Sequence, residues 1–261
     1  MRPDSRRKKI LGILKFKNTI KFKELAIALS ISEMTLYRDI KHLENSLFLS
    51  KGVVIYKENS NLYESTYFAR KGENKELKIA IAKTAIKYIK NNDTIFLDGS
   101  STVGYLVSEI IKSNFCLTVV TISPIISIEL TKKDNIKIIC PGGLLDTINF
   151  IYNCNIDNFL KSININKAFM SCGAFSIEKG LTDIAIGEYE IKRTIVDKIH
   201  ETYVLADHTK INNAFSYTWA NYGEITRLIC DNKIKKDDLK KFKDRKVEII
   251  LGNVETSNLF E

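Results

Sequence analysis

The stretch Lys23–Leu43, KELAIALSISEMTLYRDIKHL, predicts two short helices joined by a tight corner. Ser32 follows the corner and suits the N-cap of the second helix, because its hydroxyl accepts a hydrogen bond from the first turn. Leu36, Ile40 and Leu43 recur at helical spacing and therefore point inward. The opposite face suits a DNA major groove, although an ordinary helical hairpin with a solvated charged face has the same pattern. The residues expected to contact DNA are Ser32, Met34, Thr35, Tyr37, Arg38 and Lys41, with Lys51 farther along the chain.

The positive charge of the chain is concentrated in its first 75 residues. They hold 16 Lys and Arg against 8 Asp and Glu, whereas residues 76–261 hold 24 against 23. A basic segment joined to a nearly neutral one is typical of a nucleic-acid-binding domain with a separate sensor domain. No apolar run approaches the roughly 20 residues of a membrane helix, and the five cysteines are scattered singly without C-x-x-C spacing. We therefore expect a soluble, cytoplasmic protein with free thiols and no bound metal.

The segments around the corner predict a winged helix-turn-helix over residues 1–56. Arg6–Phe16 has the apolar stripe of a further helix, and Ser46–Tyr56 alternates apolar and polar residues around the turn residue Gly52. The second pattern predicts a β-hairpin wing, in which Lys51 either approaches a phosphate or is simply solvated. Residues 57–75 lack apolar periodicity and are expected to form a linker. An effector domain is expected over residues 76–250.

From residue 76 the pattern changes to short apolar runs that alternate with helical stretches. After a helix over Glu76–Lys90, strands are expected at 94–97, 115–121, 136–140, 166–171, 203–206 and 228–230, with helices at 103–111, 124–130 and 188–198. Strands alternating with helices indicate βαβ units and therefore an α/β domain with a largely parallel sheet. Such sheets bind ligands at the carboxyl ends of their strands.

Several predicted strands end in loops of small and polar residues, which together form the expected ligand site. Asp98-Gly99-Ser100-Ser101-Thr102 joins a strand to a helix, where backbone N–H groups, the helix dipole and hydroxyls face one anion. The same loop is also simply a good turn and N-cap. Lys210 follows another strand and supplies positive charge, or is solvated. The expected ligand-binding residues are Asp98, Gly99, Ser100, Ser101, Thr102, Thr121, Ser123, Gly142, Gly143, Asp183, Glu188, Lys192, Asp207 and Lys210, without a cofactor.

The order of these motifs resembles the DeoR family of bacterial transcriptional regulators. Over about residues 6–231 it consists of a helix-turn-helix, a wing, a linker helix, and then DGSST, TIS, PGG, GLTD, EYEIKR and DHTK. The resemblance implies an N-terminal domain that binds operator DNA. It also implies a C-terminal domain similar in fold to ribose-5-phosphate isomerase, glucosamine-6-phosphate deaminase and CoA-transferase subunits. In the family this domain senses a phosphorylated sugar or related metabolite, and most members are repressors released by that ligand.

The sequence departs from the family pattern at several positions. Tyr37 replaces the first arginine of the usual recognition helix, which removes a cation from the DNA-facing side. Ile122 replaces the asparagine of the usual TNS loop, and Ala185 replaces a common asparagine after GLTD. The glycine expected after Phe150 is also absent. Motifs on the phosphate side are kept better than those on the sugar side, so a phosphorylated ligand is a safer expectation than a sugar.

These observations favour a non-enzymatic regulator of carbohydrate metabolism that binds double-stranded operator DNA as a homo-oligomer and responds to a phosphorylated sugar or similar anion. Two alternatives remain at this point. One is a phosphosugar isomerase or deaminase with a DNA-binding appendage, with proton transfer by Asp98, Asp183, Glu188 or His208, although none belongs to a catalytic signature. The other is a domain that has lost its ligand through the departures above and only oligomerises.

Overall fold

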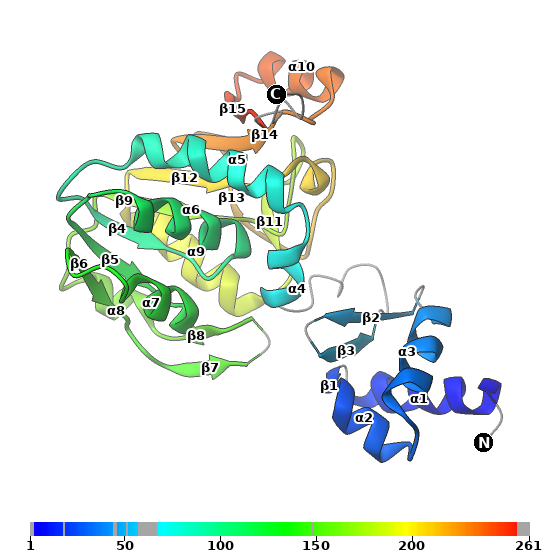
Figure 1. Ribbon diagram of the computed structural model, residues 1–261. Coiled ribbons are helices and arrows are strands. Elements are labelled where there is room, and N and C mark those ends of the chain that lie inside the picture. Colours follow the sequence, from blue (N-terminus) through cyan, green and yellow to red (C-terminus); the bar gives the residue numbers. More distant parts are fainter. Residues whose placement is uncertain are drawn as a thin grey trace, which may run out of the picture. The chain divides into compact units, whose positions relative to one another are not determined.

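The computed structural model describes residues 3–17, 19–43, 46–50, 52–56, 67–147 and 149–254. The chain divides into two compact units, Met1–Gly72 and Glu73–Glu261, which are described separately (Figure 1). The predicted combination of a winged helix-turn-helix with an α/β domain is confirmed.

The first unit contains the predicted corner and wing. Its helices include α1 (Pro3–Lys17), α2 (Phe22–Ala28) and α3 (Glu33–His42). An antiparallel sheet of order β1-β3-β2 is formed by β1 (Thr19–Lys21), β2 (Leu47–Ser50) and β3 (Val53–Tyr56). Gly52 has a φ of 80°, a conformation that glycine adopts without strain, and it lets the wing turn between β2 and β3. Leu36 and Ile40 are buried in a core shared with α1 and α2, so the inward face predicted for α3 is confirmed.

Part of the segment expected to be a linker is helical. Residues 57–66 lie outside the described residues, and Tyr67–Gly72 forms helix α4. Tyr67 and Ala69 are 0% and 4% exposed, so this helix has buried contacts. Six residues are too few to show apolar periodicity in the sequence. The next helix, α5, spans Lys75–Ala85 and continues as the short 3-10 helix η1 (Ile86–Tyr88).

The second unit is built on a parallel sheet, as predicted. Among the described residues its strand order is β15-β14-β12-β9-β4-β5-β6, and all neighbouring pairs are parallel. Ile95 and Leu97 pack in the core on one face, whereas Phe96 between them packs in the core on the other, so the sheet is buried on both sides. The strands are β4 (Thr94–Leu97), β5 (Leu117–Thr121), β6 (Ile136–Ile139), β9 (Lys167–Met170), β12 (Glu201–Leu205), β14 (Arg227–Asp231) and β15 (Ile249–Gly252).

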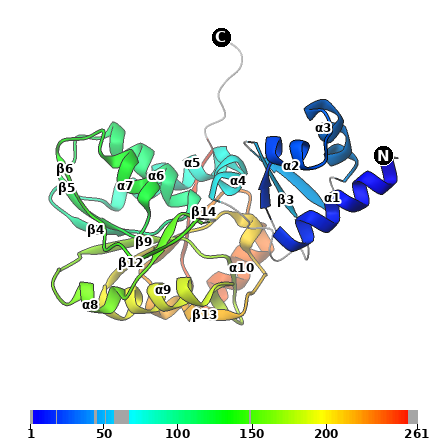
Figure 2. The ribbon, with the colours of Figure 1, turned by 90° about the horizontal axis from the view of Figure 1, so that it is seen from below.

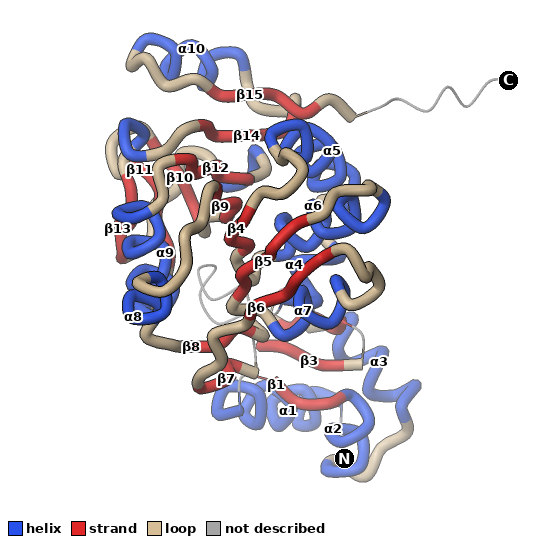
Figure 3. The backbone as a smooth tube through the Cα atoms, turned by 90° about the vertical axis from the view of Figure 1, so that its left-hand side faces the viewer, coloured by secondary structure: helices blue, strands red, loops and turns tan. Residues whose placement is uncertain are grey.

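Helices cover both faces of this sheet (Figures 2 and 3). Helices α5, α6 (Ser101–Lys112) and α7 (Pro124–Leu130) lie on one face, and α8 (Ile156–Leu160) and α9 (Ile186–Lys198) lie on the other. Helix α10 (Lys236–Asp244) comes between β14 and β15 in the chain. Because apolar side chains fill both faces, a polar site is confined to the loops at the ends of the strands.

Two small antiparallel sheets were not predicted. β7 (Leu144–Asp146) pairs with β8 (Ile151–Asn153), and β10 (Ala174–Ser176), β11 (Gly180–Asp183) and β13 (Tyr217–Ala220) form the second sheet. The GLTD motif, Gly180–Asp183, forms one of these strands and is buried throughout. Strands of three or four residues are too short to show alternation. Within the described ranges, no helix has the length and apolar content needed to cross a membrane.

Candidate functional site

The side of α3 predicted to face DNA is exposed. Met34 and Tyr37 are 63% and 53% exposed, although both are large hydrophobic side chains. Arg38 and Lys41 are exposed as well. Residues three and four positions apart on a helix are neighbours, so these four side chains form one stripe along α3. The stripe combines two cations with an aromatic ring and a flexible apolar side chain.

The start of α3 is fixed by two of the hydroxyl residues predicted to contact DNA. Ser32 is the N-cap, and its Oγ accepts a hydrogen bond from the backbone N–H of Thr35 at 3.2 Å. The two hydroxyl oxygens lie 2.9 Å apart. This confirms the predicted cap, and it places both hydroxyls at the positive end of the helix dipole. Lys51, the wing residue predicted to approach DNA, lies outside the described residues.

A buried carboxylate ties α3 to α1, and it was missed in the sequence. Asp39 is 1% exposed and accepts hydrogen bonds from Arg6 Nε, from Arg6 Nη2 at 3.2 Å and from Arg7 Nε at 3.1 Å. Burial raises the pKa of Asp39, but the two arginines more than offset this and hold the pKa below its ordinary value. Asp39 lies three positions after Leu36, on the inward face of α3. A carboxylate at a buried helix position is the sequence feature that could have indicated this ion pair.

In the second unit, Asp98 joins two of the loops at the carboxyl end of the sheet. Its Oδ1 accepts a hydrogen bond from Ser100 N at 2.9 Å, and its Oδ2 accepts one from Ser171 N at 2.7 Å. Asp98 is 2% exposed, so its carboxylate is held from inside. Ser100 Oγ in turn caps α6 by accepting from Val103 N at 3.2 Å. The predicted DGSST loop therefore begins a helix beside the residues that follow β9.

The predicted glycines pack closely against the β7–β8 pair. A Cβ atom on Gly99 would lie 2.1 Å from Cγ2 of Ile151, which is 5% exposed and covers the loop. Gly143 has a φ of 135°, and a Cβ atom there would lie 2.4 Å from the carbonyl oxygen of Asn153. Gly142 also has a positive φ, of 73°, but it borders open space. The close approach that Gly99 and Gly143 permit is thus made by the protein's own residues.

Thr121 and Ser123 are used locally at the start of α7. Thr121 Oγ1 accepts from Ser123 N at 3.1 Å, and Ser123 Oγ accepts from Ile126 N at 3.4 Å. Both predicted residues are 0% exposed. Ile122 between them is 3% exposed and packs in the core, which suits its side chain better than the expected asparagine.

Four of the predicted ligand residues meet in one buried ionic cluster. Lys192 Nζ lies 2.7 Å from Asp183 Oδ2, 3.2 Å from Glu188 Oε2 and 4.0 Å from Asp98 Oδ2. Burial by itself lowers the pKa of Lys192, but the three carboxylates raise it above its ordinary value, so the ammonium stays charged. Asp183 also accepts from Gly173 N at 2.6 Å. These groups offer several hydrogen-bonding partners to a polar ligand.

Two lysines approach the DGSST loop and the neighbouring strand end. Lys210, in the 3-10 helix η2 (His208–Lys210), donates from Nζ to the Cys172 carbonyl at 2.6 Å and lies 3.4 Å from Ser171 Oγ. Lys78, on α5, is 4% exposed and donates from Nζ to Ser101 Oγ at 3.3 Å. Lys78 was missed in the sequence. The available signal is that it lies three positions before the core residue Ile81, on an inward face.

Asp207 lies beside these lysines and is 2% exposed. Its Oδ1 accepts hydrogen bonds from Thr209 N at 3.1 Å, from the Thr209 hydroxyl and from Asn74 Nδ2 at 3.4 Å. Burial raises the pKa of Asp207, but the charges of Lys210 and Lys78 and the bonds from Thr209 hold it below its ordinary value. Asp207 is therefore an anion whose charge is balanced by two lysines.

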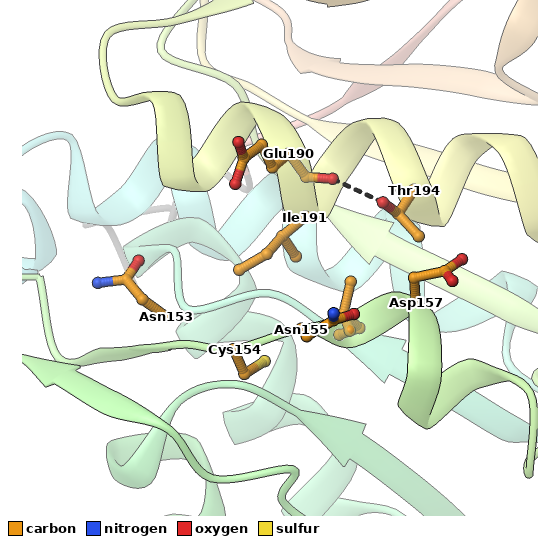
Figure 4. A pocket seen from close by; sticks show the side chains of 8 residues that line it. Asn153, Cys154, Asn155, Asp157, Glu190, Ile191 and Thr194 are labelled. Carbon is orange, nitrogen blue, oxygen red and sulfur yellow. Dashed lines mark hydrogen bonds between the residues drawn. The ribbon is translucent and has the colours of Figure 1, made fainter.

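A separate cavity of about 480 Å³ lies between α9 and the segment that joins β8 to α8 (Figure 4). Figure 4 shows Thr194 donating its hydroxyl to the Glu190 carbonyl along one wall, at 2.8 Å. Asn153, Cys154 and Asp157 line the opposite wall. Taken over the described residues, its lining contains none of the ligand-binding residues predicted from the sequence. Instead, Asp98 lies with Asp183, Glu188 and Lys192, and Asp207 lies near Lys210.

Two protein-family models match the chain. Residues 73–232 match the family model of the DeoR C terminal sensor domain, and residues 6–63 match an HTH domain model. Among solved structures, ribose 5-phosphate isomerase A from Neisseria gonorrhoeae gives a TM-score of 0.40 at 15% identity, covering 52% of this chain and 53% of that one.

Similar regulators cover almost the whole chain. The HTH-type transcriptional regulator GolR of Listeria innocua is 36% identical over 94% of this chain and 96% of its own length. The Lactose phosphotransferase system repressor of Lactococcus lactis is 29% identical over 93% of this chain and 96% of its own length. The predicted resemblance is confirmed by the sensor and HTH matches together with the full-length similarity: the chain belongs to the DeoR family of transcriptional regulators.

Proposed function

We propose that this regulator is a homo-oligomeric repressor that binds operator DNA through α3 and releases it when a phosphorylated metabolite binds beside the DGSST loop. The observation that carries the proposal is the pair of lysines at this loop. Lys78 Nζ lies 3.3 Å from Ser101 Oγ, and Lys210 Nζ lies 3.4 Å from Ser171 Oγ, next to the start of α6. Ammonium groups, hydroxyls and a helix N-terminus together suit the oxygens of a phosphate.

The charges of the described residues are distributed unevenly across this site. At one end the ammonium groups of Lys78 and Lys210 lie near the carboxylate of Asp207. At the other end Lys192 faces the carboxylates of Asp183, Glu188 and Asp98. An anionic group is favoured at the first end, and hydroxyl groups, which donate to carboxylates and accept from an ammonium, are favoured at the second. A phosphorylated polyol or sugar has both features, and the similar Lactococcus lactis protein is named as a repressor of a lactose phosphotransferase system.

The exposed stripe of α3 supports the DNA-binding part of the proposal. Arg38 offers a planar fork for a guanine or phosphate, and Lys41 offers a point charge one turn farther. A homo-oligomer that presents two such helices would bind half-sites about 34 Å apart, on successive major-groove faces.

The test of the ligand site is a thermal-shift screen of the full chain against inorganic phosphate and a panel of phosphorylated and unphosphorylated sugars. We expect a phosphorylated compound to raise the melting temperature, because a ligand that binds only the folded state stabilises it. The variant Lys210→Met should show a smaller shift at the same ligand concentration. Lys132→Met, which removes an exposed lysine after α7, should keep it. If no phosphorylated compound shifts the parent protein, the ligand part of the proposal is wrong.

A further inference from the structure

The first turn of α5 begins at the division between the two compact units and reaches the proposed ligand site twice. The division falls between Gly72 and Glu73, and Asn74 is the N-cap of α5. Asn74 Nδ2 donates to Asp207 Oδ1 at 3.4 Å. Four residues later, Lys78 Nζ donates to Ser101 Oγ. One turn of helix therefore touches both the loop after β12 and the start of α6.

The backbone of Asn74 is held in an unusual conformation. Its φ of 50° and ψ of 34° place it in the left-handed region, which non-glycine residues rarely adopt and which asparagine tolerates better than most. Its carbonyl accepts the backbone N–H of Lys78 at 3.0 Å, the hydrogen bond that starts α5. The position of the Asn74 side chain is thus linked to where the helix begins.

The Asn74–Asp207 hydrogen bond is the contact that a bound anion would disturb most easily. Its length of 3.4 Å lies beyond the usual range for an N–H···O bond, so it is weaker than the bonds from Thr209. A phosphate placed between Lys78 and Lys210 would repel the Asp207 carboxylate and compete with it for both ammonium groups. Any movement of Asp207 changes the partner of Asn74.

We propose that Asn74 reports the occupancy of the anion site to the junction between the units: its bond to Asp207 is made in the free protein and broken when an anion binds. This inference rests on the proposed function, because it needs an anion at that site. Breaking the bond loosens the start of α5, where the chain comes from the DNA-binding unit. An effector can shift the DNA-binding equilibrium only if the protein differs between its bound and free states, and the Asn74–Asp207 bond is such a difference.

The experiment measures hydrogen exchange of the full chain, with and without saturating inorganic phosphate, at ionic strength matched with potassium chloride. In the parent protein, phosphate should speed exchange of the Lys78 amide and its neighbours by about 2- to 12-fold, the factor that corresponds to one net hydrogen bond. In Asn74→Gly, which keeps the left-handed backbone but removes the amide, exchange should be fast without phosphate and unchanged by it. Asn74→Asp, which sets a carboxylate against Asp207, should behave in the same way.

Asn92→Gly is the matched control. Asn92 has a φ of 66° and is exposed on the turn before β4, so the substitution repeats the backbone change away from the site. It should respond to phosphate like the parent protein. In Asn74→Gly and Asn92→Gly, the melting-temperature shift caused by phosphate should be kept. If phosphate stabilises the parent but leaves exchange near Lys78 unchanged, or if Asn74→Gly still responds, the inference is overturned. If phosphate does not stabilise the parent at all, the proposed ligand site fails and the inference fails with it.

Discussion

Replacing Lys78 by methionine is expected to weaken binding of a phosphorylated ligand strongly. Methionine is unbranched and of similar length, so it keeps the packing of the side chain against its neighbours while it removes the ammonium. Lys78 is 4% exposed and points to Ser101, so water does not replace the lost charge easily. The substitution should therefore change the affinity for the anion and leave the surface of the domain unchanged.

The magnitude follows from the geometry of the site. A hydrogen bond to a charged group contributes about 1.5–3 kcal/mol net, and about 1.4 kcal/mol corresponds to a factor of ten in affinity. We therefore expect the Kd to rise about 10- to 150-fold in Lys78→Met. Lys210→Met should have a smaller effect, because Lys210 is only half-buried and solvent screens its charge more. The two substitutions should not be additive, since both lysines share Asp207 as a neighbour.

The assay is isothermal titration calorimetry of the parent protein, both single variants and the double variant, with the phosphorylated compound that gives the largest thermal shift. Lys132→Met, at an exposed position, serves as the control for loss of one positive charge. Circular dichroism checks that each variant is folded. A Kd for Lys78→Met within about twofold of the parent value would show that the anion is not bound beside α5, and would refute the reasoning.

Three further predictions concern other parts of the chain. Asp39→Asn should lower the melting temperature of the first unit at neutral pH. The folded-state pKa of Asp39 is lowered, so the stability that its charge provides is present above its unfolded pKa and is lost as the pH falls through the lower folded pKa. Thermal melts from pH 7 to 3 should show this loss in the parent protein and not in the variant. Gly99→Ala should destabilise the second unit by about 1–3 kcal/mol in urea unfolding, and adding Ile151→Ala should recover part of this loss; equal stability of Gly99→Ala and the parent would contradict the packing described. Arg38→Ala should cost about 1–3 kcal/mol of discrimination between operator and random duplex. Lys41→Ala should lower by about one the slope of the logarithm of the binding constant against the logarithm of the salt concentration. Small and equal effects of both substitutions would contradict the predicted placement of α3 on DNA.

The fold was predictable where a short stretch of sequence determines a local structure. The spacing of Leu36, Ile40 and Leu43 indicates one buried face of α3, and apolar runs such as 94–97 indicate strands that are buried on both sides. The β7–β8 and β10–β11 pairs were not predictable in this way. Each of their strands is three or four residues long and pairs with a partner strand; β10 and β11 are also buried, whereas β7 is largely exposed.

The candidate site was only partly predictable, because a charged residue outside a recognised motif is expected to face solvent. Asp39 and Lys78 are both buried, and their partners lie far away in the sequence: Arg6 is 33 positions from Asp39, and Ser101 is 23 positions from Lys78. Asp98 and Lys192 were both expected at the ligand site, yet their approach to 4.0 Å depends on how β4, β11 and α9 pack. A charged residue on the apolar stripe of a helix is the sequence signal that deserves more weight.

The central claim is that a phosphorylated metabolite releases this regulator from DNA. The most direct measurement is fluorescence anisotropy of a duplex selected by the full-length protein from a random pool, titrated with the panel of phosphorylated and unphosphorylated sugars. We predict that at least one phosphorylated sugar releases the parent protein from this duplex, that its unphosphorylated form does not, and that Lys78→Met binds the duplex normally but needs about 10- to 150-fold more ligand for release. Failure of every phosphorylated sugar to release the duplex, or release of Lys78→Met at the concentration that releases the parent, would contradict the claim.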